Sequence, residues 1–205
     1  MERKSTLEKL SDSLPAKITT TALAAFSGNP LAVFLPILTN TLAGSRHKER
    51  VEKAIIEIEK ILKDHEEKIQ YLSDAQYKII SETILTIFQT IDEAKLEYLK
   101  RAIKNSLLYS DISPHDAERI SRIIRDISTA EAKFLIKSKS YEFFLVGNKT
   151  KNPKKTLRLE RGSTEAKIVD GLASLGLLLI GGETWNELFH FRFSPIASGI
   201  IRLLE

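Results

Sequence analysis

Apolar residues in the middle of the chain recur at alternating steps of four and three residues, which is the spacing of one face of a helix. One run consists of Val51, Ile55, Ile58, Leu62, His65, Ile69 and Leu72, and the other of Ile80, Ile84, Ile87, Ile91, Ala94 and Tyr98. Ser73 separates the two runs and suits a helix N-cap, with Gln76 nearby. We therefore predict two long antiparallel helices, the second reaching Leu108 with a break near Asp92.

Further apolar residues widen both faces beyond what a two-stranded coiled coil needs. They are Ile56 and Ile61 beside the first run, and Ile79, Phe88 and Leu99 beside the second. A helical bundle is therefore predicted rather than a coiled coil. His65 lies within the first run, and we expect it at a helix edge or as a hydrogen-bonded core residue, in preference to a pH switch or a ligand.

The stretch from Ile18 to Ser45 has no charged side chain, although 28% of the chain's residues are charged. A single membrane-spanning helix needs about 20 mostly apolar residues, and here the turn sequence 27–30 and Pro36 interrupt the run. We predict a hairpin of two short helices buried against the bundle. Two alternatives remain: a partner-binding surface and a membrane-inserting hairpin, since the following basic residues would suit anionic lipid headgroups. The residues of that partner or membrane surface are Phe26, Leu31, Phe34, Leu35 and Leu38.

After residue 110 the predicted elements become short. Helices are predicted over 115–126, 130–137 and 163–176, strands over 141–146, 156–160, 177–180 and 189–193, and a closing helix over 196–204. Residues 181–184 are predicted to form a turn. Three helices, a β-hairpin and a closing helix are the order of a winged helix. The predicted fold is therefore mostly α: an antiparallel helical bundle over 1–110, including the uncharged hairpin 18–45, and a small α+β winged-helix-like domain over 111–205.

Charge and composition narrow the classes of function. The net charge of +4 is too small to imply nucleic acid or an anionic membrane as a partner. The chain has no cysteine, which excludes disulfides, thiolate metal sites and cysteine nucleophiles and fits the reducing cytoplasm. The first ten residues do not resemble a signal peptide. We expect a cytoplasmic protein, with peripheral contact with the membrane as a variant of that expectation.

One window of the sequence is strongly basic. It contains Lys149, Lys151, Lys154, Lys155, Arg158 and Arg161, opposed only by Glu160. These residues form a candidate site for an anionic ligand, with a solvated loop as the simpler alternative. The third predicted helix presents Glu165, Lys167 and Asp170, a poor surface for DNA phosphates.

Sequence signatures of catalysis are missing. The four histidines form no H-E-x-x-H pattern, and the chain contains neither a G-x-G-x-x-G nor a P-loop motif. Ser27 and Ser174 lack the strand–turn–helix context of a nucleophilic serine. We expect a protein that is not an enzyme, without catalytic residues, cofactor or metal.

Ten residues of the C-terminal part together form a recognisable pattern: Ala132, Leu135, Leu172, Leu175, Gly176, Leu177, Phe193, Ser194, Pro195 and Gly199. Through these residues the C-terminal part resembles the abortive-infection alpha family of bacterial proteins. The resemblance implies a role in phage defence, in which infected cells die or stop growing, and it supplies no catalytic residues.

Taken together, these observations predict a non-enzymatic defence or regulatory protein that acts through protein–protein contacts. Membrane association of the 18–45 hairpin is a variant of this prediction and would require the hairpin to leave the bundle. One alternative is a winged-helix regulator that binds nucleic acid with the basic residues 149–161. Another is a helical assembly scaffold. The expected partner is a protein or a second copy of the chain, with nucleic acid not favoured.

Overall fold

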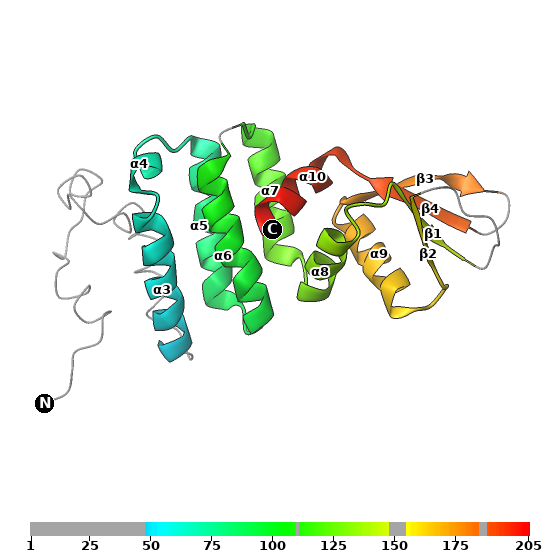
Figure 1. The fold of residues 1–205 in the computed structure, drawn as a ribbon, viewed down its shortest axis with the longest axis horizontal. Helices are drawn as coiled ribbons and strands as arrows, with labels where there is room; N and C mark the ends of the chain where they lie inside the picture. Colours follow the sequence, from blue (N-terminus) through cyan, green and yellow to red (C-terminus); the bar gives the residue numbers. More distant parts are fainter. Residues whose placement is uncertain (1–47, 110, 148–154, 185–187) are drawn as a thin grey trace, which may run out of the picture.

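The computed structural model describes residues 48–109, 111–147, 155–184 and 188–205, and all statements of structure below concern these residues. Figure 1 shows eight described helices and one four-stranded sheet arranged along a long axis, with α3 at one end and the sheet at the other. The helices are α3 (Lys48–Lys63), α4 (Glu66–Ile69), α5 (Asp74–Gln89), α6 (Glu93–Leu108), α7 (Pro114–Asp126), α8 (Thr129–Lys137), α9 (Thr164–Ser174) and α10 (Pro195–Leu204). The mostly helical class is therefore confirmed.

The first predicted long helix is interrupted at His65. The backbone N–H of His65 donates to the carbonyl of Leu62 (3.1 Å), and its Nδ1 lies 2.8 Å from the carbonyl oxygen of Ile61. The histidine ring thus takes the place of the N–H that a continuous helix would offer to Ile61. The prediction of one helix over 51–72 is wrong in this respect. His65 itself is half-buried at the break.

The second predicted helix is also two helices, and the break near Asp92 is confirmed. The Asp92 side chain accepts hydrogen bonds from the N–H groups of Ala94 and Lys95, which caps α6. Ile91 lies in the non-helical connection between α5 and α6 and is 76% exposed, so the prediction that it belongs to the buried face was wrong. Ile56, predicted to widen the first face, is likewise 51% exposed.

Serine residues fix the starts of the following helices. Ser73 and Gln76 form a reciprocal capping box at α5, and Ser128 and Glu131 form one at α8. Ser113 caps α7 and Ser163 caps α9. These helix starts confirm the predictions to within one residue. A local hydrogen bond between the serine and an N–H three residues later needs no tertiary contact, which is why the sequence alone reveals it.

The sheet comprises β1 (Phe143–Val146), β2 (Thr156–Leu159), β3 (Leu178–Thr184) and β4 (Leu188–Phe193), in the order β2-β1-β4-β3. β1 pairs parallel with β2, whereas the β1–β4 and β3–β4 pairs are antiparallel. The register shifts between Ile180 and Glu183, so Gly181 and Gly182 form a bulge within β3. The predicted turn over 181–184 is therefore wrong, because the two glycines continue the strand.

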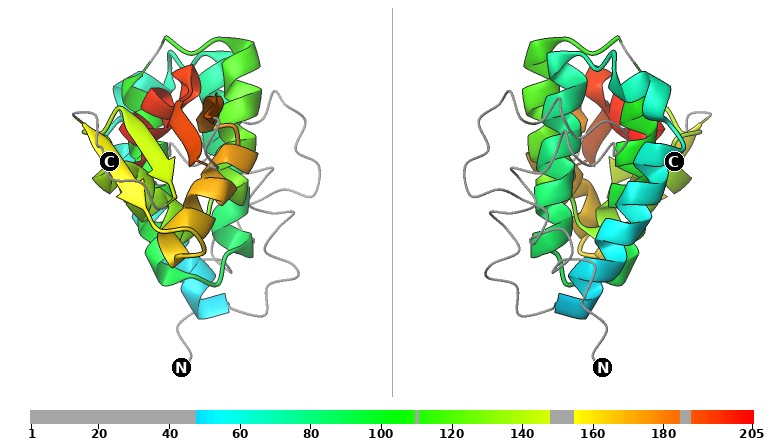
Figure 2. Two further views of the ribbon diagram at one scale, coloured as in Figure 1. Left: turned by 90° about the vertical axis from the view of Figure 1, so that its right-hand side faces the viewer. Right: turned by 90° about the vertical axis from the view of Figure 1, so that its left-hand side faces the viewer.

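A single buried apolar cluster extends from α3 to α10. α5 packs against both α6 and α7, and α10 returns from the sheet to pack against α6. Figure 2, which looks along the long axis from each end, shows α10 near the middle of the molecule. The described core is thus continuous across residue 110, while the division into domains stays a prediction.

The predicted hairpin over 18–45 lies outside the described residues. Among the helices that the structure describes, none has the length and apolar character needed to cross a bilayer.

Candidate functional site

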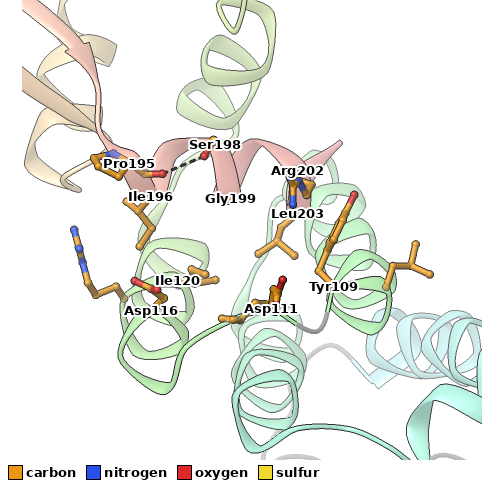
Figure 3. Close-up of a pocket in the computed structure, with 13 residues that line it drawn as sticks. Tyr109, Asp111, Asp116, Ile120, Pro195, Ile196, Ser198, Gly199, Arg202 and Leu203 are labelled. Atoms are coloured by element: carbon orange, nitrogen blue, oxygen red, sulfur yellow. Dashed lines mark hydrogen bonds between the residues drawn. The ribbon is translucent and has the colours of Figure 1, made fainter.

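A pocket of about 430 Å³ lies between α10 and the connection from α6 to α7 (Figure 3). Its volume falls within the range of sites that bind small ligands or single side chains of a partner. The lining residues are Leu108, Tyr109, Asp111, Ile112, Asp116, Arg119, Ile120, Pro195, Ile196, Ser198, Gly199, Arg202 and Leu203. Two further hollows, of about 380 and 440 Å³, adjoin α10 and share Ser198 with this pocket.

The position of α10 is set at its C-terminal end by side chains from other helices. The Nδ2 group of Asn105 in α6 donates to the carbonyl oxygens of Arg202 (3.1 Å) and Leu203 (3.0 Å). These carbonyls lie in the last turn, where a helix offers no N–H partner. Lys139, just beyond α8, forms an ion pair with Glu205. The C-terminal end of α10, which forms one wall of the pocket, is therefore held by α6 and by Lys139.

Apolar side chains form the base of the pocket. Ile120, Ile196 and Leu203 are buried, and Leu108 at the margin is 43% exposed. A single exposed leucine is ordinary on a protein surface, but this one borders a hollow, so a ligand that covered it would remove apolar area from water. The pocket thus offers an apolar contact that water can reach.

Two arginines provide positive charge. The guanidinium of Arg202 lies over the ring of Tyr109, 4.8 Å from the ring centroid, and Figure 3 shows the two side chains together at one end of the pocket. Arg119 reaches the pocket from α7. Both arginines are exposed, and neither forms an ion pair with any residue that the structure describes. Both can therefore bind a carboxylate or a phosphate of a ligand.

Two aspartates also line the pocket, and they differ in their contacts. Asp116 accepts a hydrogen bond from the hydroxyl of Ser113 (2.7 Å) at the start of α7, so its carboxylate belongs to the helix cap. Asp111 is exposed in the α6–α7 connection. Of the hydroxyl groups in the lining, that of Ser198 donates to the carbonyl of Pro195 (3.1 Å). Asp116 and the Ser198 hydroxyl are thus bound within the protein, and the pocket would bind a ligand through ion pairs with its arginines and through its apolar side chains.

The residues predicted from sequence lie elsewhere. Phe26, Leu31, Phe34, Leu35 and Leu38 fall outside the described residues, as do Lys149, Lys151 and Lys154. Lys155 is exposed and donates to Glu142 (2.6 Å), and this hydrogen bond raises the pKa of the lysine. Arg158 is half-buried in β2 and Arg161 is exposed beyond it. None of these three lines the pocket beneath α10.

Sequence reasoning missed the pocket because its walls come from distant segments. Arg119 and Arg202 belong to different helices, and neither lies in a recognisable motif. The one signal in the sequence was Arg202, a charged residue within the otherwise uncharged closing helix 195–204. Within the described ranges, no group of three or more histidine, aspartate or glutamate side chains is arranged to hold a metal ion.

Comparison with protein-family models, with curated proteins and with solved structures finds no match for this chain. The resemblance to the abortive-infection alpha family stays a prediction from the residues that carry it.

Proposed function

We propose that the protein is a non-enzymatic bacterial defence or regulatory protein that acts by binding a protein partner in the pocket beneath α10. The observation that carries this proposal is the combination of an exposed apolar margin with two arginines that lack ion pairs among the described residues. Such a site suits a segment in which an apolar side chain stands beside a carboxylate. Tyrosine and arginine contacts commonly dominate the energy of protein interfaces, and the pocket offers Arg202 stacked on Tyr109.

The C-terminal half is proposed to be a winged-helix-like module used for protein contacts. The order of α7, α8 and α9, the β3–β4 hairpin and the closing helix α10 supports this proposal. β1 adds a third strand beside β4. The exposed side chains on α9 include Glu165 and Asp170, which would repel phosphates if α9 entered a DNA groove.

Phage challenge tests the proposal. A bacterial strain expressing the full chain is infected with a panel of phages, and plaques are counted against an empty-vector strain. Expression is expected to reduce plaque numbers for at least one phage. Arg119→Glu combined with Arg202→Glu is expected to abolish this protection, because both charges that would meet the partner's carboxylate are reversed.

The matched control reverses two exposed charges away from the pocket, Lys133→Glu in α8 and Arg122→Glu in α7, and should retain protection. Circular dichroism establishes that each variant is folded. Equal plaque counts with and without the protein across the panel would contradict the defence role. Equal protection by the pocket variant and the control would contradict the role of the pocket.

A further inference from the structure

The four-stranded sheet has one face that packs against helices and another that carries aromatic and basic side chains. On the packed face, the ring of Phe144 lies 5.9 Å from that of Phe134 in α8 and 5.0 Å from that of Phe193. Residues paired across neighbouring strands point to the same side of a sheet. The register therefore places two rows on the opposite face. They are Thr156, Phe143, Arg192 and Leu179 in one row, and Arg158, Leu145 and His190 in the next.

Phe143 and His190 form a pair of rings on this face. Their centroids are 4.8 Å apart and their planes are tilted by 31°. Both residues are half-buried, so each still reaches solvent. Pairs of rings on a sheet face are the structure on which several classes of protein stack unpaired bases. On this face Leu145 is buried, and the part that solvent reaches includes Phe143, His190 and Arg192.

The bulge in β3 brings its backbone close to the histidine ring. A Cβ atom at Gly181 would lie 3.0 Å from Nδ1 of His190, closer than ordinary packing allows. Glycine at this position therefore lets the backbone of β3 approach the ring without a side chain between them. The ring of His190 consequently has no neighbouring side chain from β3 at this point of the row.

Positive charge borders the rings. Arg192, in the same row as Phe143, is exposed and has no ion-pair partner in the described part of the chain. It also lines a hollow of about 440 Å³ together with Lys139 and Ser198. Two carboxylates lie near the end of the sheet that carries Arg192, and each is bound to a lysine. Glu142 accepts a hydrogen bond from Lys155, and Glu205 forms an ion pair with Lys139. Glu160 follows directly after β2, at the end of the sheet away from Arg192.

We propose that this sheet face binds single-stranded nucleic acid, with bases stacked on Phe143 and His190 and a phosphate bound by Arg192. Flat rings beside an arginine match a ligand that carries bases and phosphates in alternation. A duplex cannot use the rings, because its bases are already paired and stacked. Single strands of RNA and DNA present the same ring faces and phosphates, so both are expected to bind. This activity is additional to the protein contact proposed for the pocket beneath α10.

Fluorescence anisotropy with the full chain tests the proposal. The probes are labelled oligouridylate and oligothymidylate of about 15 nucleotides, a length suited to such surfaces, and a duplex of equal length. Both single strands should bind at about 50 mM salt, with affinity that falls as salt rises. The duplex should bind at least about tenfold more weakly.

Two variants separate stacking from charge. Phe143→Leu keeps an apolar side chain but removes the ring, and should weaken binding between about fivefold and a hundredfold with an unchanged salt dependence. Arg192→Glu should weaken binding and lower the slope of log affinity against log salt by about one. Arg122→Glu on α7 makes the same charge change away from the sheet and should leave both the slope and the preference for single strands unchanged.

Three results would overturn the proposal: no binding of either single strand at the lowest salt, equal binding of the duplex, or equal affinity of the Arg192→Glu and Arg122→Glu variants. Position 192 is exposed, so its variant remains informative even if Phe143→Leu fails to fold.

Discussion

Asn105 holds the end of the helix that forms one wall of the pocket, and its replacement by alanine tests how that wall is fixed. The side chain donates to two carbonyl groups, those of Arg202 and Leu203. Each hydrogen bond contributes about 1 kcal/mol to the free energy of unfolding. Alanine recovers about 0.5 kcal/mol because it has a higher helix propensity than asparagine. The expected net loss is about 1.5 kcal/mol.

Thermal unfolding followed by circular dichroism measures this loss. In a chain of this size, 1 kcal/mol corresponds to about 2–4 °C in Tm, so Asn105→Ala should lower Tm by about 3–6 °C. The matched control is Lys104→Ala, at the exposed neighbouring position of the same helix, and it should change Tm by less than about 1 °C. Equal Tm values for the two variants would show that Asn105 does not anchor α10.

Three further predictions concern the remainder of the described fold. Phe144→Ala removes a ring that is completely buried in the core and should lower the free energy of unfolding by about 3–5 kcal/mol in urea titration, whereas a change below about 1 kcal/mol would place the ring outside the core. Ser73→Ala breaks the capping box with Gln76 and should cost about 1 kcal/mol in the same assay; an unchanged midpoint would show that the cap adds no stability. The pKa of Asp92 is lowered, mainly by the hydrogen bond from Thr129 and to a smaller extent by those from backbone N–H groups. The stability that the ionised Asp92 contributes is therefore fully present above the pKa it has in the unfolded chain, and it is lost as pH falls through the lower pKa of the folded state. Asp92→Asn should therefore make Tm fall less steeply with acidification below about pH 5, and an identical acid profile would contradict that assignment.

The elements best predicted from sequence are those whose signals are local. The starts of α7, α8 and α9 follow from Ser113, Ser128 and Ser163, because each serine bonds to an N–H of its own first turn. The end of α9 follows in the same way from Gly176, whose φ of 71° suits glycine. In these places the chemistry that decides the structure lies within a few residues.

The features that were missed depend either on tertiary contacts or on a local hydrogen bond that overrides the apolar spacing. The apolar spacing through His65 and Ile91 fits continuous helices, but the histidine ring binds a helix carbonyl and Asp92 caps a new helix start. Gly181 and Gly182 carry a turn signal, yet pairing with β4 continues across them as a bulge. The pocket combines α7 and α10 with the α6–α7 connection, and their proximity is a property of the tertiary packing alone.

Site-specific photo-crosslinking in infected cells can show whether the pocket beneath α10 contacts a protein partner. A photoreactive amino acid is placed at Leu108, on the pocket margin, or at Lys133, on the exposed side of α8. Position 108 should give one discrete crosslinked product, and this product should disappear when Arg119 and Arg202 are both changed to glutamate. No product from position 108, or the same product from position 133, would contradict it.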